Sequence, residues 1–234
     1  MTSTPADQSL PAAAPSPAAV EVEYLVPAAG ELAVAELEIK KSRFIAWIGR
    51  SDDEAAAREL IALARQEYPD ARHHCSAFQF HVDGANSVER FSDDGEPSGT
   101  AGKPMLEVLR GSGLSNIAAV VIRYFGGVKL GTGGLVRAYS DAVTEALQQV
   151  PRVRRRLRTL VVTSAEVGEA GRIEAELRAR GFHIVETKWA EEVSFDIAVS
   201  EAEIAAVDAA MAELTKGAAA PARRLGRQWQ EVPA

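Results

Sequence analysis

Apolar and polar positions alternate along the first half of the chain in the manner of strands that bury one face. The alternation predicts strands over residues 32–39, 44–48, 78–82 and 88–91. Between the second and third of these, Ser51 and Glu54 have the spacing of a capping box, which satisfies free amides at the start of a helix. The sequence therefore predicts a helix that begins after Ser51 and that Pro69 ends.

The middle of the chain changes from alternating to continuous apolar positions. Residues 117–122 are nearly all apolar, which is typical of a central strand buried on both faces. Before it, a polar run over 92–99 predicts a loop, and Pro104 suits the first turn of a helix. After it, a glycine-rich loop over 126–134 leads into a helix that ends at Pro151. The apolar face of that helix comprises Leu135, Tyr139, Ala142 and Ala146.

The last third of the chain predicts a simple order of elements. It consists of a strand over 160–167, a helix over 168–180, strands over 182–189 and 193–199, a helix over 201–214 and a strand over 223–232. This βαββαβ order is typical of a ferredoxin-like module, in which two helices cover one face of a four-stranded sheet.

Two segments lack these patterns and divide the chain. Residues 1–20 are rich in Ala, Pro, Ser and Thr, which predicts a disordered tail. Residues 151–158 break the periodicity with five arginines, which predicts a basic linker between an α+β domain over 21–150 and the module over 159–234. The linker arginines either meet phosphates by charge or are solvated, and the sequence favours neither. They are Arg152, Arg154, Arg155, Arg156 and Arg158.

Composition narrows the class of protein. Of the 234 residues, 47% are apolar and 25% are charged, as in ordinary globular proteins. The net charge of -7 argues against a nucleic-acid binder that uses its whole surface, but it leaves room for a local basic patch. With one cysteine, no transmembrane run of roughly 20 apolar residues and no signal-peptide pattern, we expect a cytoplasmic protein.

The first segment with unusual chemistry is the acidic, glycine-rich run over 93–104, which is too polar for a core. Its glycines let a partner approach the backbone, and its carboxylates suit a cation or basic groups. The alternative is a capped acidic surface turn. The candidate residues of this loop are Asp93, Asp94, Glu96, Ser98 and Thr100.

The second segment, over 123–137, joins the buried strand to a helix N-terminus, where free amides and glycines suit a phosphate. It has neither the P-loop spacing nor the Gly-x-Gly-x-x-Gly spacing, so it does not indicate nucleotide hydrolysis. Tyr124 and Phe125 either stack on a base or pack in the core, and burial is the more common outcome. The candidate anion or nucleic-acid ligands are Lys103, Arg123, Lys129, Gly131, Gly133, Gly134 and Arg137.

The run His73-His74-Cys75 suggests a metal site or a nucleophile, but its spacing supports neither. Neighbouring strand residues point to opposite faces, and no pair with ordinary zinc-ligand spacing accompanies the run. A catalytic cysteine would also need a base from elsewhere in the fold. We therefore predict no catalytic residue, no metal and no cofactor.

Four motifs, taken together, resemble the N-terminal domain of the YigZ/IMPACT family. They lie at residues 40–46, 71–77, 93–104 and 123–139, and the resemblance covers residues 31–147. It implies a ribosomal-protein-S5-domain-2-like fold for this domain and a C-terminal module similar to the ferredoxin-like domains of elongation factor G. Because eukaryotic members are linked to translation control, it also implies a translation-associated setting.

Three functions are compatible with these features. The first is a non-enzymatic regulator that binds RNA, ribosomal particles or a translation factor through a basic groove around the glycine-rich loops. The second is an enzyme acting on a small phosphorylated substrate, with the loop carboxylates as acid–base or metal groups. The third is a protein–protein adaptor. We expect the first, away from any membrane, and the sequence leaves the oligomeric state open.

Overall fold

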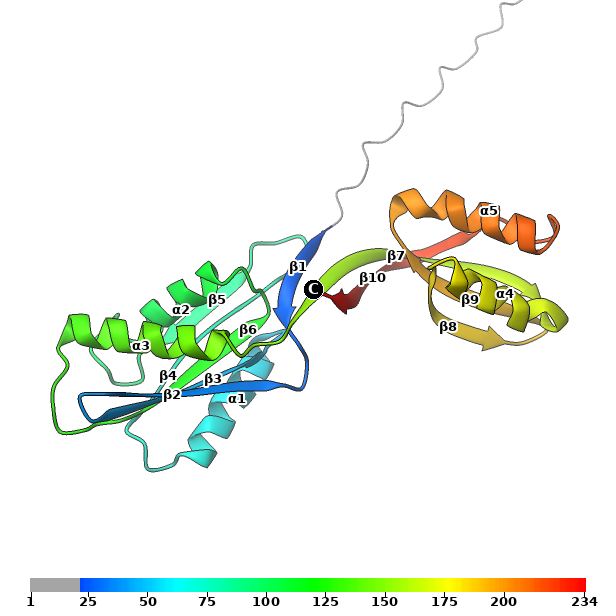
Figure 1. The fold of residues 1–234 in the computed structure, drawn as a ribbon. Coiled ribbons are helices and arrows are strands. Elements are labelled where there is room, and N and C mark those ends of the chain that lie inside the picture. The colour runs from blue at the N-terminus through cyan, green and yellow to red at the C-terminus, as the bar shows by residue number, and fades with distance from the viewer. Residues whose placement is uncertain (1–21) are drawn as a thin grey trace, which may run out of the picture. The chain divides into compact units, whose positions relative to one another are not determined.

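The computed structural model describes residues 22–234, so the tail predicted over 1–20 lies outside the described residues. The described chain forms two compact units, one over 23–156 with 231–234 and the other over 157–230 with residue 22. Both units contain helices and antiparallel strands, which confirms the predicted α+β class (Figure 1). No helix within residues 22–234 is long and apolar enough to cross a membrane.

The first unit is built on an antiparallel five-stranded sheet in the order β2-β3-β6-β4-β5. Its strands are β2 (Leu32–Ile39), β3 (Ser42–Arg50), β4 (His73–Phe80), β5 (Val88–Ser92) and β6 (Ile117–Tyr124). The predicted central strand is confirmed, because β6 lies between β3 and β4 and is buried along seven of its eight residues. A further strand, β1 (Glu23–Pro27), pairs with the start of β7.

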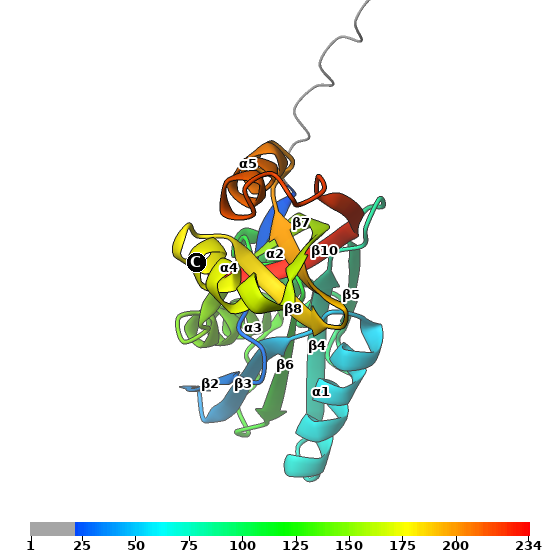
Figure 2. The same cartoon turned by 90° about the vertical axis from the view of Figure 1, so that its right-hand side faces the viewer.

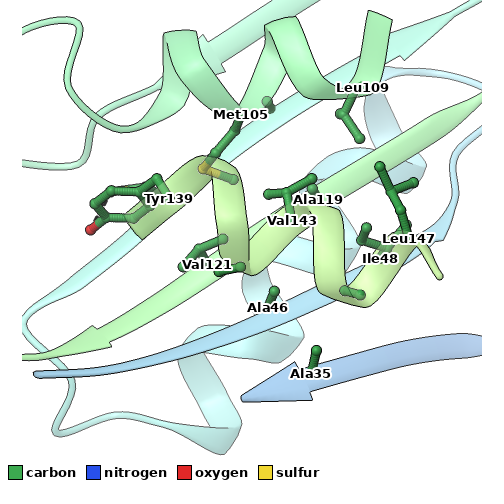
Figure 3. Packing of buried hydrophobic residues seen from close by; sticks show 14 of the residues in the cluster. Ala35, Ala46, Ile48, Met105, Leu109, Ala119, Val121, Tyr139, Val143 and Leu147 are labelled. Carbon is green, nitrogen blue, oxygen red and sulfur yellow. Dashed lines mark hydrogen bonds between the residues drawn. The ribbon is translucent and has the colours of Figure 1, made fainter. Parts of the chain in front are cut away.

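Helices cover both faces of this sheet, as Figures 1 and 2 show: α2 (Gly102–Gly111) and α3 (Thr132–Leu147) lie on one face, and α1 (Glu54–Glu67) lies on the other. The two faces of β6 divide accordingly, because Val121 packs with the α2 and α3 residues and Val120 packs with the α1 residues. The predicted face of α3 is buried, and Figure 3 shows Tyr139 and Val143 in one cluster with the sheet residues Val121 and Ala119.

The start of α1 differs from the predicted capping box. Asp53 is the N-cap, and its carboxylate accepts a hydrogen bond of 2.8 Å from the amide of Ala56. Ser51 does not complete the predicted capping box, in which its amide would donate to the Glu54 side chain. That amide instead donates to Asn116 O at 2.9 Å, beyond the end of the β3–β6 pairing. The serine hydroxyl instead donates to the carbonyl of Asp53.

The second unit has the predicted βαββαβ order. Its elements are β7 (Arg152–Glu166), α4 (Val167–Ala179), β8 (His183–Trp189), β9 (Glu192–Val199), α5 (Ile204–Leu214) and β10 (Arg223–Pro233), with a 3₁₀ turn at Glu201–Glu203. Residues 152–156 of β7 and 231–233 of β10 are counted with the first unit. Strand β7 pairs with β10 and β9, and β9 pairs with β8, which is the ferredoxin-like order. Residues of α4 and α5, such as Leu177 and Met211, share one core with Phe195 of β9.

The arginine-rich segment differs from the irregular linker that broken periodicity predicts, because β7 already begins at Arg152. Its first residues pair with β1 through backbone hydrogen bonds, which need no apolar side chains. The arginines also have carboxylate partners. Arg154 and Arg156 pair with Glu23, Arg155 with Asp52 and Arg158 with Glu203.

Candidate functional site: a pocket between the two glycine-rich segments

The two glycine-rich segments meet at a pocket of about 420 Å³ in the first unit. The acidic loop contributes Glu96 and Pro97, and the chain before and within β4 contributes Arg72 and His73. The connection from β6 to α3 contributes the remaining lining residues: Arg123, Phe125, Lys129, Leu130, Gly131, Thr132 and Leu135. Cations, one carboxylate and apolar side chains therefore face the same space.

Asp93 organises the acidic loop from inside. Its carboxylate accepts hydrogen bonds from the amides of Gly99, Ala101 and Gly102 at 2.8, 3.0 and 2.8 Å. The amides of Ala101 and Gly102 lie at the N-terminus of α2, where a negative charge is favourable. Gly102 must be glycine, because a Cβ atom there would lie 2.6 Å from the carbonyl oxygen of Ser92. Asp93 is thus a structural residue rather than the cation ligand considered from the sequence.

Asp94 connects the same loop to α1 and β4. Its carboxylate accepts hydrogen bonds from the Arg65 guanidinium and the His74 amide, each at 2.6 Å. Partial burial alone would raise the pKa of Asp94, but these hydrogen bonds outweigh it and hold the pKa below its ordinary value. Both oxygens of Asp94 are therefore engaged within the protein.

Glu96 and Arg123 form the floor of the pocket. Arg123 Nη1 donates to Glu96 Oε1 at 2.5 Å, and Tyr139 donates to the same oxygen at 2.8 Å. The side chains of Arg123 and Glu96 are 6% and 4% exposed, so this is a buried ion pair. Arg123 was predicted as a ligand for an anion or a nucleic acid, and in the structure its guanidinium pairs with Glu96.

Cys75 contacts the acidic loop and Tyr139, because its Sγ is 3.0 Å from Asp93 O and 3.3 Å from the Tyr139 hydroxyl. Burial raises the pKa of the Cys75 thiol to about 12, so the thiolate that a nucleophile requires is not formed at neutral pH. Within residues 22–234, no group of three His, Cys, Asp or Glu side chains is arranged to hold a metal ion.

The N-terminus of α3 opens onto the pocket. The helix begins at Thr132, so Gly133 and Gly134 belong to its first turn rather than to the predicted loop. Gly131 is the N-cap with a φ of 73°, and no described side chain caps this end. The first amides of the helix therefore have no helical partner, and Gly131 and Thr132 line the pocket.

Other predicted residues lie outside the pocket lining. Lys103 and Arg137 are exposed on α2 and α3, and Ser98 is exposed in the acidic loop. Thr100 is buried, and its hydroxyl donates to Pro97 O at 2.7 Å.

The sequence reasoning missed two pocket residues, Arg72 and His73, as ligand-binding candidates. The motif over 71–77 marked this position, but its histidines were considered only for a metal site or a Cys–His nucleophile. We expected Tyr124 and Phe125 to be buried. This prediction is wrong for Phe125, which is 47% exposed and lines the pocket. Tyr124 is partly buried, and its hydroxyl donates to Asp70.

Comparisons with known proteins agree with this division of the chain. Residues 40–147 match the Impact N-terminal domain, and residues 168–218 match a domain of unknown function, DUF1949. The chain is 45% identical over 183 residues to the IMPACT family member YvyE of Bacillus subtilis, covering 78% of this chain and 83% of that protein. It is 42% identical over 194 residues to the IMPACT family member YigZ of Escherichia coli, covering 83% and 94%.

A crystal structure of a hypothetical protein also matches nearly the whole chain. It is 39% identical in sequence and has a TM-score of 0.57, and the match covers 91% of this chain and 97% of that one.

Proposed function

Because the chain belongs to the IMPACT family, we propose that it is a cytoplasmic, non-enzymatic, translation-associated regulator that binds RNA, free or in ribosomal particles, through the pocket of its first unit. The observation that carries this proposal is the pocket itself, which joins Arg72 and Lys129 to the uncapped N-terminus of α3. Amides at a helix start and nearby cations are a general solution for binding phosphate.

The charge available to a ligand comes from Arg72 and Lys129. Neither side chain forms a hydrogen bond or an ion pair with any residue in the described part of the chain. The other cation in the lining, Arg123, offsets the charge of Glu96. The pocket thus retains positive charge although the whole chain carries a net charge of -7, which favours a local phosphate contact.

The shape of the site favours a single strand over a duplex. A pocket of about 420 Å³ is within the range of small-molecule sites and takes one nucleotide-sized group rather than a double helix. The exposed ring of Phe125 offers a stacking surface, and the Arg123 guanidinium lies 5.7 Å from its centre on one side. Aromatic stacking with a charged groove is the usual way to bind single strands.

The same pocket volume is compatible with a second candidate function, the binding of a small phosphorylated ligand in the pocket. Thermal shift with a panel of nucleotides and sugar phosphates separates the two candidates, because a tight ligand raises the apparent stability. A large shift by one of these compounds, without any affinity for an oligonucleotide, would favour the second candidate.

The test of RNA binding is the salt dependence of the affinity for a fluorescent single-stranded RNA. We expect Lys129→Glu with Arg72→Glu to weaken binding and to lower the slope of log K against log salt by about 1.4, since each lost phosphate contact removes about 0.7 for single strands. The control is Arg90→Glu, a charge reversal on β5 at a residue that does not line the pocket. Equal effects of both changes, or no effect of either, would contradict the proposal.

A further inference from the structure

Two hydrogen-bond acceptors in the pocket have no donor among residues 22–234, and the first is Nε2 of His73. The other ring nitrogen, Nδ1, lies 2.8 Å from the carbonyl oxygen of Asp94. A carbonyl oxygen only accepts, so Nδ1 carries the hydrogen in this contact. In the neutral imidazole the lone pair is then on Nε2, and this nitrogen makes no hydrogen bond to any residue of the described chain.

The second acceptor is Oε2 of Glu96. The hydrogen bonds from Arg123 and Tyr139 both go to Oε1, and no described residue donates to Oε2. The Glu96 side chain is 4% exposed and that of His73 is 14% exposed, yet both residues line the pocket. His73 Nε2 lies 3.9 Å from Glu96 Oε1, too far for a hydrogen bond between them. Neither atom is fully buried without a partner, so both acceptors are open to a hydrogen-bond donor of a ligand in the pocket.

The His73 ring is held in this orientation by Asp94. Asp94 has a φ of 41°, in the left-handed region, and its carboxylate is fixed by Arg65 and the His74 amide. This anchoring directs its carbonyl oxygen to His73 Nδ1, so Asp94 is a positioning residue for the histidine.

We infer that His73 and Glu96 accept the hydrogen of a ribose hydroxyl, and that His73 thereby selects RNA over DNA. This inference rests on the proposed RNA binding. A phosphate has no proton to donate to these acceptors and is repelled by the Glu96 carboxylate, so it belongs with Arg72, Lys129 and the start of α3. The 2′-hydroxyl is the group near the phosphate that can donate, and DNA lacks it.

The test compares one sequence as single-stranded RNA, as DNA and as 2′-O-methyl RNA. We expect the wild-type chain to bind RNA about tenfold more tightly than either of the others, as one hydrogen bond to a polar group allows. His73→Phe should lose this preference by weakening RNA binding more than DNA binding. His73→Gln, which keeps a donor for Asp94 O and an acceptor, should retain part of it. Circular dichroism of each variant checks its fold.

The outcomes separate the inference from the function on which it rests. Equal binding of RNA and DNA, still sensitive to Lys129→Glu, would overturn the role of His73 and leave the phosphate site intact. Absence of binding to every oligonucleotide would refute the proposed function. In that case, a rise of the thermal midpoint with ribose 5-phosphate but not with 2-deoxyribose 5-phosphate would support hydroxyl recognition in a small-molecule site.

Discussion

Arg123 on β6 donates to Glu96 in the acidic loop at 2.5 Å, and the two residues are 27 positions apart in the sequence. This buried pair joins the two glycine-rich segments at the floor of the pocket. It also changes the role of Arg123 from a ligand for phosphate to the partner of an acidic side chain. Arg72 and Lys129 are therefore the pocket cations that can pair with a phosphate of the ligand.

Removal of Glu96 should destabilise the first unit, because it leaves the Arg123 charge buried without a partner. We expect Glu96→Ala to reduce the free energy of unfolding by about 3–5 kcal/mol, measured by urea denaturation. Adding Arg123→Met should recover part of this loss, since the second change removes the unpaired charge.

A matched control for Glu96 is Glu36→Gln, which removes a pair with Arg43 in which both side chains are about half exposed, at 48% and 46%. Exposed pairs contribute little, so this change should have a small effect. If Glu96→Ala unfolds at the same urea concentration as Glu36→Gln, the pair does not stabilise the floor of the pocket.

The lowered pKa of Asp94 predicts a pH dependence with a definite sign. Because the folded state binds this proton less tightly than the unfolded state, the stabilising effect of Asp94 is complete above its ordinary pKa of 3.8 and is lost as the pH falls through the lower folded value. We expect Asp94→Asn to lower the urea midpoint at pH 6 and to have progressively less effect below about pH 3.8.

The control for the pH series is Asp141→Asn, a change at an exposed residue of α3 that makes no hydrogen bond or ion pair with residues 22–234. Its difference from wild type should not vary with pH in this way. A constant difference for Asp94→Asn between pH 6 and pH 2.5 would show that the ionised carboxylate is not what stabilises the loop.

Gly126 is required by a close approach of the chain to the β2–β3 turn. A Cβ atom at this position would lie 2.0 Å from the carbonyl carbon of Lys41, which is backbone and cannot turn aside. Gly126→Ala should therefore cost at least about 2 kcal/mol of stability, as overpacking against a rigid neighbour does.

The control for Gly126→Ala is Gly133→Ala, in the first turn of α3, where an added Cβ atom would meet no atom within 4 Å. It should leave the thermal midpoint unchanged or slightly raised, since alanine favours helix. Similar midpoints for the two variants would argue against the close approach at Gly126.

Local patterns in the sequence predicted most elements of the fold. The helix expected over 168–180 is α4 (Val167–Ala179), and the strand expected over 182–189 is β8 (His183–Trp189). Periodicity succeeds here because the buried residues of a helix or strand recur at a regular spacing within one short stretch of sequence. It failed at the start of β7, because the pairing of arginine-rich β7 with β1 uses backbone groups that leave no apolar pattern.

The sequence by itself determined the two-unit α+β architecture and marked both glycine-rich segments as exposed backbone. Only the tertiary structure decided which charges remain available to a ligand. Arg123 and Lys129 are six positions apart and both carry a positive charge, yet Arg123 is paired with Glu96 whereas Lys129 has no carboxylate partner in the described chain. Ion pairing depends on separations of a few ångströms between segments far apart in sequence, and only the packing of β4, β6, the acidic loop and α3 sets those separations.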